Sequence, residues 1–249
     1  AYPLVIMSAS NSIMQFVDRK FLAENSTLDV AASMPAGILY FTLFAFFMST
    51  CNYTSALVAQ YHGANDRSSV LHAVWAGQTL AVAAGVIITF LIPPIGRFCI
   101  LHSGHPVELI SRELEYFSSL LPSGVFLCMA APCFAFFSGQ GRTIPVAVIN
   151  ISGCLLNIFL DYIFIFGKCG LPAFGIFGAG IATSICCFCI MAAAMICFYA
   201  QNQRKIPTRK RWEFRPELIR KLIRFGAPAG FQTFIDVGAW TMVSFLIGH

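Results

Sequence analysis

The sequence predicts an all-α polytopic membrane protein. We expect a six-helix transmembrane lobe, followed by the beginning of a seventh helix that belongs to a second, repeat-related lobe. Of the 249 residues, 57% are hydrophobic and only 11% are charged, whereas a soluble domain has roughly 25% charged residues. In addition, apolar runs of about 20 residues, the length that crosses a bilayer, alternate with short polar breaks.

Seven segments are apolar enough and long enough to span a membrane. In chain order they are residues 2–22, 30–61, 70–92, 115–138, 144–166, 175–199 and 222–249. Pro93 and Pro94 are expected to end the third segment, because proline lacks the N–H that a helix needs. The breaks between segments are mostly short and rich in Gly, Pro and Asn, so neighbouring helices are expected to run antiparallel.

Basic residues predict the orientation. Residues 201–224 hold nine of the sixteen Lys and Arg, so the positive-inside rule places this loop in the cytoplasm, together with Arg67 and Arg142. The predicted domains are a first lobe over 1–200, a cytoplasmic loop over 201–217 and a second lobe over 218–249. We expect a multi-pass protein of the cell (inner or plasma) membrane and no nucleic-acid partner. The alternative for the loop is that it binds nucleic acid or lipid headgroups.

Cysteine and histidine do not predict a metal or catalytic centre. The ten cysteines lie mostly in apolar runs and fit no zinc-site spacing, so we interpret them as small packing residues. The five histidines form no pair at ligand spacing. Since there is also no nucleophile elbow, phosphate loop or HExxH motif, we expect neither an enzyme nor a cofactor.

The most informative stretch is 150–166, an apolar segment with one carboxylate, Asp161. Asn150, Asn157 and Asp161 fall within about 40° of one another on a helical wheel, so they form one polar stripe. An ionised carboxylate at bilayer depth costs at least a few kcal/mol, which predicts a functional site. The alternative is a structural hydrogen bond between helices.

The first segment also has a polar face, which spans about 120° of the helix. Its members are Ser8, Asn11, Ser12, Gln15 and Asp18. Asp18 is therefore a second candidate carboxylate. Because Arg19 and Lys20 follow it, the alternative is a helix end at the water interface whose charges pair among neighbours.

A weak internal repeat predicts the second lobe. Aligning Pro228 with Pro3 again places a proline near the start of a membrane helix and a carboxylate, Asp236, within it. Two-repeat construction is common in transporters. We therefore expect a second lobe to begin near Leu218 and to be incomplete at His249, and the chain to start in or just before its first membrane helix.

Six stretches resemble the multidrug and toxic compound extrusion (MATE) family. They follow the family order along essentially the whole chain: Val17-Asp18, 58–66, 139–145, 157–164, 175–183 (GIFGAGIAT) and 230–237. The last of them resembles the seventh helix of the NorM-like branch, which usually has Glu at the position of Asp236.

The resemblance implies a V-shaped antiporter with two lobes and twelve helices that expels organic cations in exchange for Na⁺ or H⁺. It implies an ion-coupling site of Asp18, Asn157 and Asp161 in the first lobe, and Asp236 as the first acidic site of the second lobe. The remaining candidates would line the cavity: Asn11, Gln15, Tyr116, Thr183 and Gln232. The family commonly has a small polar residue after the first Asp, whereas Arg19 and Lys20 here could neutralise Asp18.

The expected mechanism is exchange on carboxylates. Asp161 would hold a proton, or Asp18, Asn157 and Asp161 would supply oxygen ligands to Na⁺. The other expected partners are a small organic cation and the lipid bilayer, and we expect a monomer. The alternative function is a flippase for lipid-linked precursors from the same broader superfamily, whose cavity should contain Arg or Lys for phosphate.

Overall fold

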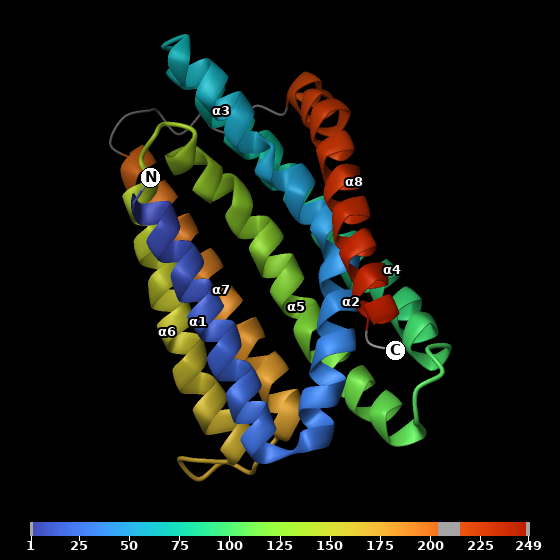
Figure 1. Ribbon diagram of the computed structural model, residues 1–249. Helices are drawn as coiled ribbons and strands as arrows, with labels where there is room; N and C mark the ends of the chain where they lie inside the picture. The colour runs from blue at the N-terminus through green and yellow to red at the C-terminus, as the bar shows by residue number, and fades with distance from the viewer. Residues whose placement is uncertain (1, 204–214, 248–249) are drawn as a thin grey trace.

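The computed structural model describes residues 2–203 and 215–247, and all of its regular structure there is helical. Eight helices follow one another along the chain (Figure 1): α1 (Tyr2–Asn25), α2 (Thr27–Asn52), α3 (Thr54–Gly63), α4 (Arg67–Leu101), α5 (Val107–Ser138), α6 (Thr143–Phe166), α7 (Gly175–Gln203) and α8 (Pro216–Ile247). The predicted all-α fold class is confirmed.

Helix α5 lies at the centre of the bundle. It packs against α2, α4 and α7, while α1 packs on α6, α6 on α7, and α8 on α2 and α4. Figure 1 accordingly shows α1, α6 and α7 on one side of α5, and α2, α4 and α8 on the other. Two groups of helices thus share one central helix.

Small residues allow the closest of these contacts, that of α5 with α7. A Cβ on Gly180 would overlap the Ser119 hydroxyl group, and the Ser184 hydroxyl donates to the Ser119 carbonyl oxygen at 2.7 Å. The two backbones therefore approach closely, as is common where membrane helices pack through small residues.

Five helical stretches of the described chain are long and apolar enough to cross a membrane, namely Thr27–Gly63, Arg67–Leu101, Val107–Ser138, Thr143–Phe166 and Gly175–Gln201. They correspond to the second to sixth predicted segments. The first and seventh predicted segments, which lie in α1 and α8, are not among these five stretches of the described chain. The predicted boundaries between the lobes and the basic loop remain predictions.

Two predicted helix boundaries are wrong. Pro93 and Pro94 do not end the third segment, because α4 continues through both of them to Leu101. In an apolar surrounding an unwound backbone would find no other hydrogen-bond partners, so the helix persists until the polar turn at Ser103. The second segment is instead divided at Tyr53, which separates α2 from α3.

Two helices begin earlier than predicted. Helix α2 starts at Thr27, where the Ser26 hydroxyl group accepts a hydrogen bond from the Leu28 N–H at 3.2 Å. Helix α5 starts at Val107, directly after Pro106. Asp29 and Glu113, which hydropathy leaves outside the membrane segments, are consequently helical and buried.

The connections alternate between the two ends of the bundle. The end that holds Arg67, Arg142 and Arg215, here called the basic end, contains the connections α3–α4 and α5–α6, the end of α7 and the start of α8 (Figure 1). The opposite end, here called the distal end, contains the connections α1–α2, α4–α5 and α6–α7. This arrangement agrees with the predicted antiparallel order of neighbouring helices.

Candidate functional site

The buried polar stripe of α6 forms the core of the candidate site. Asp161 is 0% exposed and Asn157 is 1% exposed. The two side chains are four residues apart on a helix, so they lie on the same face, one turn from each other. Asn150, on the same stripe, donates to the Val146 carbonyl oxygen at 2.8 Å, and apolar side chains of α6 such as Leu155 and Phe159 are exposed instead.

Four helices present polar residues at a similar depth. Asp18 is seven residues before the end of α1, Asp161 five before the end of α6, Tyr116 nine after the start of α5, and Thr183 eight after the start of α7. All four termini are at the distal end, so at 1.5 Å per residue these side chains lie about 8–14 Å below it. The helix order thus collects them in one layer.

Asp18 and Asp161 form a carboxyl pair across the contact between α1 and α6. Their side chains lie within hydrogen-bonding reach of each other. However, Oδ1 of Asp18 and both carboxyl oxygens of Asp161 are buried without a donor from the described residues. Two ionised carboxylates offer each other no proton, so the pair requires a bound cation or a proton on one member to offset burial.

Asn157 adds a further acceptor. The Thr183 hydroxyl group donates to the Ala179 carbonyl oxygen at 3.0 Å, so its oxygen is left to accept from Nδ2 of Asn157 at 3.5 Å. This contact orients the amide, and Oδ1 of Asn157 is buried without a donor from the described residues. Carboxylate and amide oxygens without donors are the ligands that a hard cation binds.

The other candidates on this side of the bundle are less buried. Asn11 is half-buried on α1, and its Oδ1 accepts a hydrogen bond from the Cys154 thiol at 3.1 Å. Tyr116 lies close enough to Asp18 and Asp161 to interact with them electrostatically. Gln15 is exposed on α1. The structure therefore brings Asn11 and Tyr116 to the stripe and leaves Gln15 on the open face of α1.

Asp236 and Gln232 are not part of this cluster. Both are exposed on α8, a helix that packs against α2 and α4 rather than against α1 or α6. Their assignment to a second lobe stays a prediction.

Arg19 and Lys20 do not form an ion pair with Asp18 within the described chain. Lys20 instead approaches Glu24, one turn further along α1, at 3.8 Å. Arg19 is exposed and acts on Asp18 only as a neighbouring charge. The carboxyl pair therefore stays without a direct cationic partner from this helix.

No group of three or more His, Cys, Asp or Glu side chains among the described residues has metal-binding geometry. The predicted ion ligands do not form such a group, since two of them are carboxylates and the third is an amide. Four oxygens of Asp18, Asn157 and Asp161 are buried without a donor from the described residues, and their role as ion ligands stays a prediction.

Sequence reasoning missed a second acidic cluster near the distal end. Glu113 is 1% exposed and pairs with Nδ1 of His105 at 2.7 Å. Asp29 is 2% exposed, accepts from Nδ2 of Asn25 at 2.8 Å and lies 3.7 Å from Nε of Arg112. Hydropathy could not identify these acids, because each lies beside a polar connection.

The chain resembles known transporters in sequence. It is 29% identical over 254 residues to the multidrug resistance protein PmpM of Pseudomonas aeruginosa, covering 100% of this chain and 52% of the relative. It is also 29% identical over 243 residues to the probable multidrug resistance protein NorM of Haemophilus ducreyi, covering 94% and 51%. The chain thus spans about half the length of the curated relatives it matches.

The fold agrees with this similarity. A multidrug resistance MATE family transporter of the MOP superfamily, solved in an outward-facing conformation, superposes with a TM-score of 0.82 at 21% identity, covering 93% of this chain and 51% of that one. The MatE family matches residues 3–163, which is more than half of the sequence. The chain is a multi-pass membrane protein and belongs to the MatE family.

Proposed function

We propose that this chain is the first lobe, and the beginning of the second, of a secondary active transporter that exports organic cations in exchange for Na⁺ or H⁺. Its relatives carry the names of multidrug resistance proteins. The observation that carries the proposal is the buried pair of Asp18 and Asp161, whose inner oxygens have no donor from the described chain.

The ion would bind between α1 and α6. With H⁺, one proton shared by Asp18 and Asp161 would relieve the repulsion of the two carboxylates. With Na⁺, Oδ1 of Asn157 would add a third kind of oxygen ligand, held in place by Thr183. Both ions neutralise the same pair, so the same residues serve either form of coupling.

Coupling follows from competition for this negative charge. A cationic substrate in the cavity is favoured when the carboxyl pair is ionised, and disfavoured when the pair has bound an ion. Because α1 packs on α6 and the pair joins the two helices, ion binding would also change how closely they approach. Ion entry would thereby promote substrate release.

The remaining assignments follow from the same proposal. The protein would lie in the inner or plasma membrane as a monomer, with the basic end in the cytoplasm. Gln15 on α1 and Gln232 on α8 would face the central cavity, and Asp236 would provide the first acidic group of the second lobe. The chain would need no cofactor besides the coupling ion.

A flippase for lipid-linked precursors is less well supported. Its ligand carries phosphate, which calls for Arg or Lys in the cavity. In the layer of α1, α5, α6 and α7 described above, Asp18, Asp161 and the phenol of Tyr116 lie close together, whereas Arg19, which acts on Asp18 and Tyr116 as a neighbouring charge, is exposed. A buried acidic pair favours cations instead.

The test is efflux of ethidium, a fluorescent organic cation, from cells that produce the full-length protein. Wild type is compared with Asp161→Asn under imposed Na⁺ and pH gradients. We expect gradient-driven efflux in wild type and at least a tenfold loss in the variant, with equal protein in the membrane. The gradient that drives efflux identifies the ion.

Glu24→Gln is the matched control, since it neutralises an exposed carboxylate on α1 whose partner is Lys20. It should transport like wild type. Unchanged efflux in Asp161→Asn would make Asp161 a structural residue. No efflux from wild type under any gradient would favour the flippase.

A further inference from the structure

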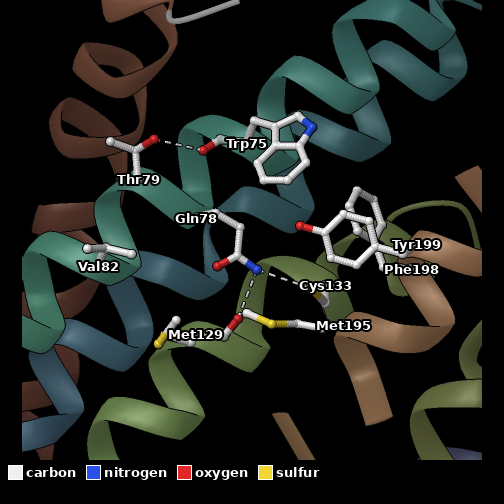
Figure 2. Close-up of a pocket in the computed structure, with 9 residues that line it drawn as sticks. All are labelled: Trp75, Gln78, Thr79, Val82, Met129, Cys133, Met195, Phe198 and Tyr199. Carbon is white, nitrogen blue, oxygen red and sulfur yellow. Dashed lines mark hydrogen bonds between the residues drawn. The ribbon is translucent and has the colours of Figure 1, made fainter. Parts of the chain in front are cut away.

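A cavity lies on helices other than α1 and α6, which carry the carboxyl pair. It is formed by α4, α5 and α7 and has a volume of about 210 Å³. Helices α4 and α7 each pack extensively on α5 and contact each other through aromatic rings. They therefore form the two walls of a groove whose floor is α5 (Figure 2).

The groove lies toward the basic end. Trp75 is eight residues after the start of α4, and Tyr199 is four residues before the end of α7, both at the basic end. At 1.5 Å per residue, Trp75 is about 12 Å along α4. Helix α4 has 35 residues and is therefore longer than a hydrocarbon core of about 30 Å is thick. Centred in the bilayer, it extends beyond the core by about 12 Å at each end. Trp75 thus lies near the hydrocarbon boundary, and the groove extends inward from it.

The lining is aromatic and thioether-rich and contains no charged residue. The ring of Trp75 lies 6.1 Å from that of Phe198 and 6.0 Å from that of Tyr199, measured between centroids. Met129 and Met195 provide polarisable sulfur beside these rings. Aromatic and thioether side chains pack well against an aromatic ligand.

One buried polar group faces this apolar space. Gln78 is 8% exposed, and its Nε2 donates to the Met129 carbonyl oxygen at 3.0 Å and to the Cys133 sulfur at 3.1 Å. No hydrogen bond from the described chain reaches its Oε1, which Figure 2 shows on the side of the amide away from Cys133. The two hydrogen bonds of Nε2 thus fix the side-chain amide of Gln78, and Oε1 remains available to accept a hydrogen bond from a ligand.

We propose that this groove binds a small, neutral, aromatic amphiphile with one hydrogen-bond donor, such as a phenol dissolved in the membrane. The lining supplies no countercharge for an ion, which excludes a buried cation or anion as the preferred ligand. An acyl chain fills apolar space but leaves Oε1 of Gln78 without a donor. A cavity of about 150 Å³ holds one benzene ring, so 210 Å³ accommodates a ring with a substituent.

Trp75 provides the signal for a binding test. The two other tryptophans, Trp212 and Trp240, are replaced by Phe, and the full chain is placed in lipid nanodiscs. Bromine quenches tryptophan fluorescence at contact, so 4-bromophenol is titrated at neutral pH, with bromobenzene as the probe that lacks a donor. We expect saturable quenching and at least tenfold tighter binding of 4-bromophenol.

Two variants test the geometry. Gln78→Leu should abolish the preference for 4-bromophenol. Gln140→Leu is the control and should retain it, because the Gln140 amide donates a comparable hydrogen bond to the Phe136 carbonyl oxygen at 2.7 Å but lies outside the groove. Tyr199 is 39% exposed, so Tyr199→Leu tests an aromatic wall with little risk to folding. It should weaken both probes severalfold.

Three results would overturn the proposal. Equal affinity for the two probes would leave an apolar cleft without a specific acceptor. Tighter binding of 4-bromobenzylammonium than of 4-bromophenol would make this a cation site. Finally, brominated acyl chains in the nanodisc quench Trp75 where they reach it, and unbrominated phenol should relieve this quenching. Quenching that persists after phenol is added would show that a lipid chain occupies the groove.

Discussion

The buried acids of this protein fall into two kinds, which differ in their partners. Glu113 has His105, and Asp29 has Asn25 and Arg112. Among the described residues, Asp161 faces the carboxyl group of Asp18 and has no hydrogen-bond donor. A buried charge is tolerated as long as its partner remains, whereas two unneutralised carboxylates repel each other and destabilise the fold. The first kind is structural, and the second is suited to binding an ion.

Glu113→Ala should destabilise the protein. The substitution leaves His105 without its 2.7 Å partner and opens space beside a side chain that is 1% exposed. A cost of about 1–3 kcal/mol is expected for a buried, hydrogen-bonded group. The measurement is the thermal unfolding midpoint in detergent, with Glu108→Ala in the first turn of α5 as the exposed control. Equal midpoints for the two variants would contradict the assignment.

Asp161→Asn should leave the unfolding midpoint in sodium-free buffer unchanged or raise it. The amide is nearly isosteric, carries no charge and can donate to Asp18, which removes the repulsion within the pair. Functional sites often trade stability for activity in this way. A decrease as large as that of Glu113→Ala would instead indicate that Asp161 is structural.

The sequence predicts which side chains are buried polar groups in some cases and misses them in others. Asp161 stands out because the rest of its segment is apolar, and helical spacing adds Asn157 correctly to its face. Glu113 and Asp29 are missed because neighbouring charges hide them from a hydropathy count. The burial of a residue depends on which helices pack over it, and the residues next to it in the sequence do not show which helices these are.

The helices are predicted in number and order better than at their ends. The apolar core of each predicted segment is helical, but α4 continues past Pro93 and Pro94 and α5 starts eight residues before Glu115. Hydropathy marks the part of a helix that lies in hydrocarbon. Caps and polar turns determine where it ends, and a helix can extend into the interface on either side.

The start of α4 gives a prediction with a defined pH dependence. The Asp66 carboxylate accepts from the Ser69 N–H at 3.0 Å and from its hydroxyl group at 2.6 Å. These hydrogen bonds lower the pKa of Asp66 below the 3.8 of an unperturbed aspartate. Because the folded pKa is lowered, the cap is fully present above about pH 4 and is lost as the pH falls through the folded value.

Hydrogen exchange of the first turn of α4 tests this cap. After correction for the intrinsic rate, exchange should accelerate severalfold between pH 5 and pH 3 in wild type, and should be fast at both pH values in Asp66→Ala. Asn also caps helices but does not titrate in this range. Asp66→Asn should therefore show slow exchange without the pH step, and a persisting step would assign the transition to another group.

The arrangement of the whole molecule is the part that the sequence alone predicts least. A polar or small-residue face shows that a helix packs on something, but it does not identify the partner. The contact of α8 with α2 is an example: Ser49 donates to the Thr233 hydroxyl oxygen at 3.0 Å, although the residues are 184 positions apart. The family resemblance, rather than periodicity, predicts that two lobes meet.

Gly230 allows α8 to lie against α2. A Cβ at this position would lie 2.6 Å from the Phe46 carbonyl oxygen and 2.6 Å from the Thr50 hydroxyl oxygen. The carbonyl belongs to the α2 backbone and cannot rotate away, so Gly230→Ala must move one helix relative to the other. Overpacking of this kind costs about 1–3 kcal/mol.

Gly238 lies in the same helix and provides the matched control, because a Cβ there would meet nothing within 4 Å. Alanine is the better helix former by about 1 kcal/mol, so Gly238→Ala should slow hydrogen exchange in α8 or leave it unchanged. Gly230→Ala should accelerate exchange over 216–239 while α6 stays protected, since α6 does not pack on α8. If both variants protect α8 equally, the contact with α2 does not hold this helix in place, and its position must depend on other contacts, such as those with α4.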